Sequence, residues 1–179
     1  MAHRLLERVS SLLAASGLTV ATAESCTGGL LAKLLTDVPG SSGWVLGGVV
    51  AYANEVKQQV LGVSPGTLQR HGAVSAETVR EMAEGVRRLL GADLAVAISG
   101  VAGPGGGSAE KPVGTVYLDL YDGATHVVVS RHFGGDRNGV RRWSARTALE
   151  MLHEHLSRQG PDRRPPHPPS PRPRRCPST

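Results

Sequence analysis

The spacing of apolar residues predicts a chain of alternating helices and strands. Apolar side chains recur three and four positions apart in the helical segments, which are 5–13, 30–35, 79–90 and 140–152. Short continuous apolar runs, typical of buried strands, occupy 18–23, 44–52 and 94–99. Helices and strands thus follow one another along the first hundred residues.

Capping residues set the expected boundaries of the two middle helices. Asn54 is expected to cap a short helix that runs through Val60, and Ser75 a longer helix that ends at Gly91. Polar N-caps satisfy amides of the first turn, which have no partner inside the helix. Both helices therefore begin where the sequence supplies a hydrogen-bond acceptor.

The C-terminal half adds a hairpin and a last helix. Asp122-Gly123 lies between strand-like segments 115–121 and 126–133, the arrangement typical of a β-hairpin. The last helix is expected after Asp136, with inward-facing side chains at Val140, Trp143, Thr147, Met151 and Leu152. These elements predict an α/β fold in which helical layers flank a mixed β-sheet.

Composition divides the chain near residue 157. Residues 158–179 hold six Arg against one Asp, and eight of the twelve prolines follow Gly160. We expect residues 1–157 to form one domain and residues 158–179 to form a disordered Arg/Pro-rich tail. The whole excess of positive charge lies in the tail, so we expect no nucleic-acid partner for the folded domain. A solvated appendage is the preferred interpretation of the tail, with a nucleic-acid tether as the alternative.

Cysteine usage and the N-terminal sequence favour a cytoplasmic protein. Cys26 and Cys176 are too few for a disulfide framework. The first sixteen residues carry charges at Arg4, Glu7 and Arg8, unlike a signal peptide. No apolar run is long enough to span a bilayer, so we expect no membrane partner.

Ser25 follows the first predicted strand, and two glycines, Gly28 and Gly29, separate it from the predicted helix that begins at residue 30. A side chain at such a junction projects beyond the sheet, where the amides of the next residues can hold a phosphate or a developing oxyanion. On the sequence alone, helix capping is the preferred explanation of Ser25. The neighbouring Cys26 is a rival nucleophile, because a thiol is intrinsically more reactive.

Lysine is scarce in this arginine-rich chain, which contains only Lys33, Lys57 and Lys111. A desolvated lysine can lose its proton and act as a base, whereas arginine cannot. Lys57 is therefore a candidate base, and a solvated surface lysine is the alternative.

Other chemistries find less support. The stretch from Ser99 to Gly107 contains five glycines, which fits either close approach to a ligand or a flexible connector, but it matches no Walker or dinucleotide-binding motif. A Ser-His-Asp site would require His71, His126 or His132 to approach Ser25. No cluster of residues has metal-ligand spacing, so we expect no metal.

Six motifs occur in a fixed order along the chain, and they are Ala23–Leu30, Gly48–Lys57, His71–Ser75, Ser99–Gly107, Glu110–Val116 and Gly135–Arg137. Together they resemble the CinA C-terminal domain family, whose characterised members are nicotinamide-nucleotide amidohydrolases, also called nicotinamide mononucleotide deamidases. The resemblance covers roughly Leu5 to Leu156.

This resemblance implies a role for particular residues. Ser25 corresponds to the nucleophile, Lys57 to the general base and Tyr52 to an assisting hydrogen-bonding partner. Arg137 corresponds to the ligand of the substrate's 5′-phosphate, for which a guanidinium fork is well suited. The other expected substrate contacts are Thr27, Gly28, Ser42, Ser99, Gly100 and Gly103.

The resemblance also implies an activity, namely hydrolysis of nicotinamide mononucleotide to nicotinate mononucleotide and ammonia through a serine acyl-enzyme, in pyridine nucleotide recycling. No cofactor is expected, and relatives suggest a homo-oligomer, with a dimer favoured. The N-terminal molybdopterin-binding-like domain of longer relatives has no counterpart here, so no pyrophosphatase activity is expected. The alternative is a non-catalytic nucleotide-binding module linked to competence or DNA damage.

Overall fold

The computed structural model describes residues 2–159, so most of the expected tail lies outside the described residues. The elements follow one another in the order α1 (Ala2–Ser16), β1 (Val20–Glu24), α2 (Leu30–Thr36), the 3-10 helix η1 (Ser41–Gly43), β2 (Val45–Val50), α3 (Asn54–Gln59), α4 (Pro65–His71), α5 (Ala76–Leu90), β3 (Leu94–Gly100), β4 (Thr115–Tyr121), β5 (His126–His132) and α6 (Arg137–Gln159). Apart from α4, this is the order of the main elements that the sequence predicts. Within this range no helix is both long and apolar enough to cross a membrane.

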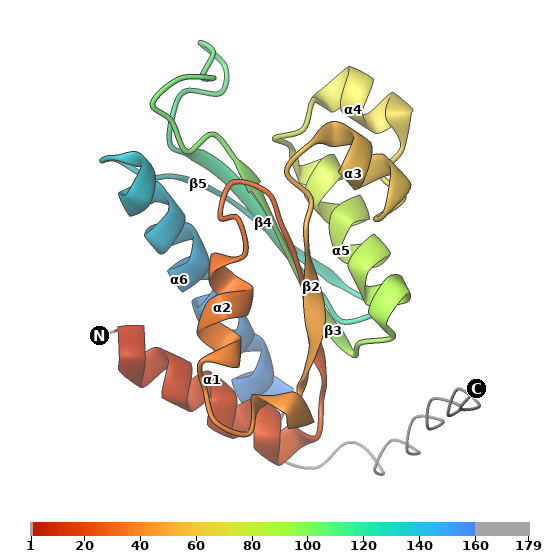
Figure 1. Ribbon diagram of the computed structural model, residues 1–179, viewed down its shortest axis with the longest axis vertical. Coiled ribbons are helices and arrows are strands. Elements are labelled where there is room, and N and C mark those ends of the chain that lie inside the picture. Colours follow the sequence, from red (N-terminus) through yellow and green to blue (C-terminus); the bar gives the residue numbers. More distant parts are fainter. Residues whose placement is uncertain (1, 160–179) are drawn as a thin grey trace, which may run out of the picture.

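The five strands form one mixed sheet in the order β2-β1-β3-β4-β5 (Figure 1). The first three strands are parallel, and β4 and β5 add to β3 as an antiparallel hairpin. Glu24 at the end of β1 pairs with Val50 on one side and with Ile98 on the other. The carboxyl ends of the three parallel strands therefore meet at one edge of the sheet. The predicted fold class is confirmed.

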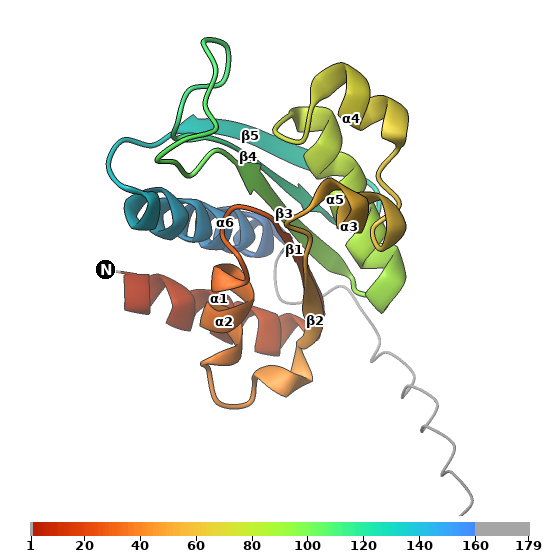
Figure 2. The same ribbon diagram turned by 45° about the horizontal axis from the view of Figure 1, so that its top comes forward.

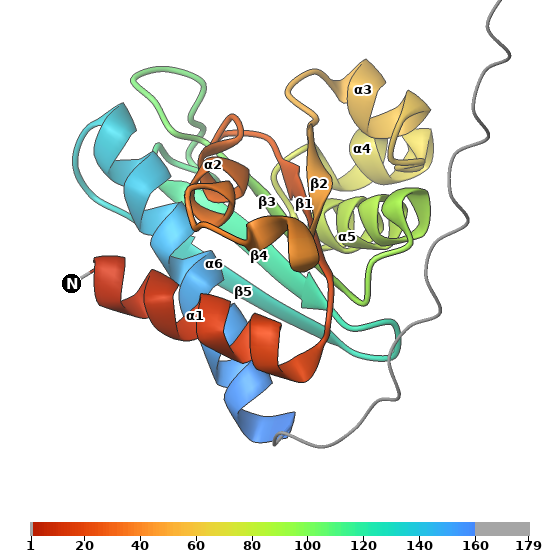
Figure 3. The ribbon, with the colours of Figure 1, turned by 60° about the horizontal axis from the view of Figure 1, so that its bottom comes forward.

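Helices cover both faces of the sheet (Figures 2 and 3). The helices α1, α2 and α6 lie on one face, while α3, α4 and α5 lie on the other. On β3 the side chains of Leu94, Val96 and Ile98 enter the core beneath α1, α2 and α6, whereas Ala95 and Ala97 face α5. Alternation of large and small side chains thus gives the sheet one thick and one thin apolar layer.

One helix of the structure was not predicted, and one predicted helix has a different N-cap. The helix α4 was not expected, although Ser64 caps it by accepting a hydrogen bond from the Gly66 amide at 3.2 Å, and Pro65 occupies its first turn. Proline at the first helical position is a known start signal. Asn54 does not cap α3 but is its first residue, and Ala53 at the N-cap makes no side-chain bond.

Two large side chains that belong to the apolar patterns of the predicted helices, Trp143 of the last helix and Leu89 of segment 79–90, are exposed. Trp143 on α6 is 48% exposed, and Leu89 on α5 is 52% exposed. The inward stripe of α6 contains small residues such as Ser144, Ala145 and Ala148, which let the helix approach the sheet closely. Trp143 lies outside this stripe, with the guanidinium of Arg146 over its ring at 5.3 Å.

A glycine fixes the distance between α5 and the segment after α3. A Cβ atom added to Gly85 would lie 1.9 Å from the carbonyl oxygen of Leu61 and 2.7 Å from its carbonyl carbon. Both Gly85 and Leu61 are buried, and the clashing atoms are main-chain atoms. The two segments can therefore pack as they do only if residue 85 has no side chain.

Gly85→Ala is expected to destabilise the protein, although this exchange inside a helix ordinarily stabilises by about 1 kcal/mol. We expect a loss of about 2 kcal/mol in the free energy of unfolding, measured by urea denaturation, because the helix must move away from Leu61. The control is Gly66→Ala in α4, where the nearest atom to the added Cβ is 3.4 Å away. Equal stability of Gly85→Ala and the wild type would contradict this account.

Candidate functional site

Ser25 begins the turn that joins β1 to α2. Its amide donates to the Ile98 carbonyl at 2.9 Å, which extends the pairing between β1 and β3 by one residue. The chain then reverses through Gly28 and Gly29, whose φ angles of 60° and 88° lie in the left-handed region that favours glycine. The hydroxyl of Ser25 is thereby presented beyond the carboxyl end of the parallel strands.

Lys57 reaches this hydroxyl from α3. Its amine nitrogen lies 3.3 Å from Ser25 Oγ, and it also donates to the carbonyl oxygens of Ala51 at 2.8 Å and Tyr52 at 3.2 Å. The side chain is only 1% exposed. The structure therefore brings together the two residues that the sequence had singled out, 32 positions apart, and Lys57 is not a surface lysine.

Burial lowers the pKa of Lys57 from its ordinary value of 10.5. Desolvation disfavours the charged ammonium, and the opposing Coulombic effects of Cys26 and Glu55 do not outweigh it. The amine thus loses its proton at a lower pH than an exposed lysine would. A neutral amine beside a hydroxyl is a suitable general base.

Cys26 is turned away from this pair into the core. The side chain is 5% exposed and belongs to the apolar cluster on the α1, α2 and α6 face. Desolvation raises the pKa of its thiol to about 11. Because the thiolate is the reactive form of cysteine, Cys26 is a poor nucleophile in this environment.

The turn after Ser25 offers main-chain N–H groups. Within the described residues, no carbonyl accepts the amides of Cys26 and Thr27. By contrast, the amides of Leu31 and Ala32 in the first turn of α2 donate to the buried carboxylate of Glu24 at 3.0 and 2.8 Å. In this turn the amides of Cys26 and Thr27 are therefore without a carbonyl partner among the described residues, whereas the Gly28 amide donates to the Ser25 carbonyl and the start of α2 is already capped.

Arg137, Tyr52 and Gly103 form a second group beside the Ser25–Lys57 pair. Arg137 donates from Nη1 to the Gly103 carbonyl at 2.8 Å and from Nη2 to the Tyr52 hydroxyl at 3.0 Å. Tyr52 is 61% exposed, and its backbone carbonyl accepts from Lys57. The Tyr52 phenol thus contacts Arg137 and makes no hydrogen bond to Ser25 or Lys57.

The glycine-rich loop after β3 contributes through its main chain. The Ser99 hydroxyl donates to the Ala73 carbonyl at 2.7 Å and is buried. A Cβ at Gly100 would lie 2.7 Å from the Thr115 carbonyl oxygen, so the pairing with β4 requires glycine there. These two residues hold the loop at the edge where Ser25 lies, with Gly103 as its contact to Arg137.

Ser42, which the sequence placed among the substrate contacts, lies at the other end of the sheet. It belongs to η1, just before β2, and Val45 at the start of β2 pairs with Val20 at the start of β1. Ser25 follows the end of β1, about 16 Å further along at the rise of an extended strand. Within this chain Ser42 therefore does not join the site that the resemblance implied for it, because η1 precedes β2 whereas the site follows the ends of the strands.

Among the described residues no histidine is hydrogen-bonded to Ser25, whose hydroxyl contacts Lys57 instead. His126 lies between two carboxylates, with Nδ1 2.6 Å from Asp119 and Nε2 3.2 Å from Glu84. His71 pairs with Glu77 at 3.7 Å. Among the described side chains no group of His, Cys, Asp and Glu is arranged to hold a metal ion.

Two residues of the site were missed by the sequence analysis. Arg141 donates from Nε and Nη2 to the Thr27 carbonyl at 3.2 and 2.8 Å, and Glu24 caps α2 from seven positions upstream. A signal for Arg141 existed, because it lies four residues after Arg137 and so shares its face of α6. Nothing in the spacing around Glu24 indicates its distant cap.

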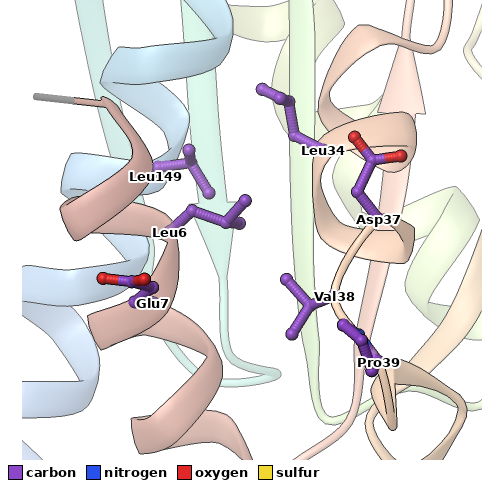
Figure 4. Close-up of a pocket in the computed structure, with 7 residues that line it drawn as sticks. All are labelled: Leu6, Glu7, Leu34, Asp37, Val38, Pro39 and Leu149. Atoms are coloured by element: carbon purple, nitrogen blue, oxygen red, sulfur yellow. The ribbon is translucent and has the colours of Figure 1, made fainter.

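A separate pocket of about 530 Å³ opens between α1, α2 and α6 (Figure 4). Its lining is mostly apolar, with the carboxylates of Glu7 and Asp37 at its margin, and it is formed by Leu6, Glu7, Leu34, Asp37, Val38, Pro39 and Leu149. Asp37 follows the end of α2, whereas Ser25 precedes its start. The pocket is thus distinct from the site, and it brings no nucleophile and base together.

The fold and the site define an α/β protein with a serine–lysine pair at the carboxyl edge of its parallel strands. The model of the CinA C-terminal domain matches residues 2–156, and the chain belongs to this family.

Known relatives agree with this assignment. CinA-like proteins from Thermotoga neapolitana and Geobacter sulfurreducens are 51% and 53% identical over 158 and 148 residues. These matches cover 88% and 83% of this chain but only 38% and 36% of the relatives, so the chain spans well under half of their length.

Solved structures match over nearly their whole length. A competence-damaged protein (CinA) superfamily protein from Klebsiella pneumoniae has a TM-score of 0.85 at 40% identity, covering 88% of this chain and 99% of that one. The competence/damage inducible protein CihA from Agrobacterium tumefaciens has a TM-score of 0.84 at 44% identity, covering 87% and 95%.

The environment of Cys26 predicts slow alkylation. With a pKa of about 11 against an ordinary 9.0, the thiolate fraction at pH 8 falls by about 100-fold, and burial slows access further. We expect iodoacetamide to modify Cys26 at least about 100-fold more slowly than free cysteine, as measured by mass spectrometry in a Cys176→Ser background. Rapid modification of the folded protein would show that the thiol is available as a nucleophile.

Proposed function

We propose that this domain hydrolyses the carboxamide of nicotinamide mononucleotide, giving nicotinate mononucleotide and ammonia. The observation that carries the proposal is the contact between Lys57 Nζ and Ser25 Oγ at 3.3 Å, in a site where the lysine is almost fully buried. A hydroxyl becomes a useful nucleophile when an adjacent base takes its proton. Membership of the CinA family agrees with an amidohydrolase of this kind.

The contacts of Lys57 suit the role of base. A neutral amine has two N–H groups and one lone pair. The carbonyls of Ala51 and Tyr52 accept the two N–H groups, which leaves the lone pair for the proton of Ser25. Both carbonyls are main-chain groups, so the amine is oriented without the help of another side chain.

The reaction then proceeds in two halves. Ser25 Oγ attacks the carboxamide carbon as its proton passes to Lys57, and the amides of Cys26 and Thr27 stabilise the resulting oxyanion. Lys57 returns this proton to the leaving nitrogen, the C–N bond breaks, and ammonia departs from the acyl-enzyme. Water next attacks the ester carbon, with Lys57 again taking a proton, and Ser25 leaves as the restored hydroxyl while the carboxylate product is released.

Arg137 supports a phosphorylated substrate over free nicotinamide. Its guanidinium is exposed at the rim of the site and held by Gly103 and the Tyr52 hydroxyl, with further N–H groups available. A guanidinium fixed in this way can form charge-assisted hydrogen bonds to phosphate oxygens. The exposed ring of Tyr52 then lies between this phosphate position and the Ser25–Lys57 pair, where it can line the path of the nucleotide.

The test is release of ammonia from nicotinamide mononucleotide compared with free nicotinamide. Ser25→Ala and Lys57→Arg are each expected to lower kcat by about 10³-fold or more, because the first removes the nucleophile and the second supplies a side chain that cannot be deprotonated. Circular dichroism and the unfolding midpoint establish that both variants are folded.

Matched controls come from the same residue types elsewhere. Ser42→Ala, at the opposite end of the sheet, and Lys33→Arg, at an exposed ion pair with Asp37, are expected to retain full activity. Binding of the nucleotide without turnover by the wild type would instead indicate a non-catalytic module. Full activity of Ser25→Ala or Lys57→Arg would remove that residue from the mechanism.

The lowered pKa of Lys57 predicts the pH dependence of the reaction. The base is active when unprotonated, so kcat/KM should rise with pH by about tenfold per pH unit and level off above the pKa of Lys57. That inflection should lie below 10.5, the ordinary value, because burial lowers the pKa. A rate that falls as pH rises through this range would mean that the protonated amine is the active form.

A further inference from the structure

Arg141 contacts the turn that carries Ser25 from the next turn of α6 beyond Arg137. Both Nε and Nη2 donate to the Thr27 carbonyl, at 3.2 and 2.8 Å. The side chain is half-buried, and a Cβ on Gly28 would come within 3.5 Å of its Nη2 atom. In the described part of the chain no carboxylate forms an ion pair with Arg141. Its two hydrogen bonds to the turn are therefore its principal polar contacts.

Other contacts anchor the ends of this turn, and main-chain hydrogen bonds join its middle. On the strand side, the Glu24 carbonyl accepts from the Ala51 amide at 2.8 Å. On the helix side, the Glu24 carboxylate holds the first turn of α2. Between these anchors, the Gly28 amide donates to the Ser25 carbonyl at 3.0 Å and the Leu30 amide donates to the Thr27 carbonyl at 3.3 Å, and Arg141 adds its two side-chain hydrogen bonds to the same Thr27 carbonyl.

The position of Thr27 affects the reacting centre. Gly28 and Gly29 both have positive φ angles, and glycine can adopt alternative backbone conformations at little steric cost. The amides of Cys26 and Thr27 belong to the two peptides that precede the Thr27 carbonyl, so they move when Thr27 itself is displaced. A guanidinium that donates twice to the Thr27 carbonyl restrains this displacement.

We propose that Arg141 is a positioning residue, which holds the Thr27 carbonyl so that the amides of Cys26 and Thr27 face the oxyanion formed at Ser25. This inference rests on the proposed function for its substrate. It assigns Arg137 and Arg141, one helical turn apart, to separate tasks. Arg137 binds the phosphate of the substrate. Arg141 holds the Ser25 turn in the conformation that stabilises the oxyanion.

The experiment compares Arg141→Ala and Arg141→Lys with Arg142→Ala, an exposed arginine on the same helix. Arg141→Ala is expected to lower kcat for ammonia release by about 100-fold, the effect of losing an oxyanion donor, with KM within about threefold of the wild type. The kcat of Arg141→Lys should lie between those of the wild type and Arg141→Ala, because an ammonium lacks the planar pair of N–H donors of a guanidinium. Arg142→Ala should match the wild type. A large rise in KM at unchanged kcat would make Arg141 a substrate ligand and overturn the proposal, as would unchanged kinetics.

A second readout does not depend on the substrate. Phenylmethanesulfonyl fluoride sulfonylates activated serines, and mass spectrometry gives the rate at Ser25. We expect Arg141→Ala to slow this labelling strongly and Arg142→Ala to leave it unchanged. Slowed labelling together with no ammonia release by the wild type would retain Arg141 as a positioning residue and reject the nucleotide substrate. Equal labelling of Arg141→Ala and wild type, or neither labelling nor turnover in the wild type, would overturn the proposal.

If Arg141→Ala is unfolded at the assay temperature, Arg141→Lys decides the question by the same two measurements. A purely structural role would lower the unfolding midpoint of Arg141→Lys while leaving kcat and labelling of the folded protein unchanged. That result would count against positioning. A lowered kcat at an unchanged midpoint would support it.

Discussion

A lysine amine removed from water must be surrounded by oxygen atoms, and it holds its proton less tightly than an exposed lysine. Lys57 meets both conditions, with three oxygen neighbours and a lowered pKa. Two of these oxygens are main-chain carbonyls of the segment between β2 and α3, so α3 must begin immediately after the strand and fold back over its end. That path places Nζ beside Ser25, and the rest of the site is arranged around this contact.

The strand order explains how Lys57 and Ser25 approach from different sides. The strand β1 lies between β2 and β3, and all three are parallel. After β1 the chain enters α2 on one face of the sheet, and after β2 it enters α3 on the opposite face. Where neighbouring connections diverge in this way, space for a ligand opens at the carboxyl ends of the strands. The Ser25 turn comes from one side of this opening and Lys57 from the other.

The sequence predicted the fold class and the order of the main elements, and the resemblance to the CinA family predicted that Ser25 and Lys57 lie together. The spacing of apolar residues was sufficient to predict α1, α5 and the central strands, because most large apolar residues of these elements are buried. It failed for Trp143 and Leu89, since large apolar side chains also occur on exposed faces. It also missed α4, whose signal lies in the Ser64-Pro65 cap and not in a hydrophobic stripe.

Site residues whose roles depend on main-chain contacts could not be predicted from spacing. Glu24 and Arg141 act on amides and a carbonyl that any residue type would provide, so no pattern of partner residues marks them. Ser42 shows the opposite error, because the resemblance assigned it to the site although it lies at the other end of the sheet within this chain. Distances along the chain do not reveal at which end of a strand a loop lies until the direction of pairing is known.

Under the proposed function, the choice of nucleophile follows from the direction of two adjacent side chains. Cysteine is intrinsically the better nucleophile, and Cys26 and Ser25 share one turn. The first side chain after β1 lies beside Lys57, whereas the second enters the core, where the pKa of the thiol rises to about 11. The same turn therefore places the serine next to an amine and leaves the thiol protonated. In the proposed mechanism the local backbone, more than the intrinsic reactivity of the atoms, decides which residue carries out the chemistry.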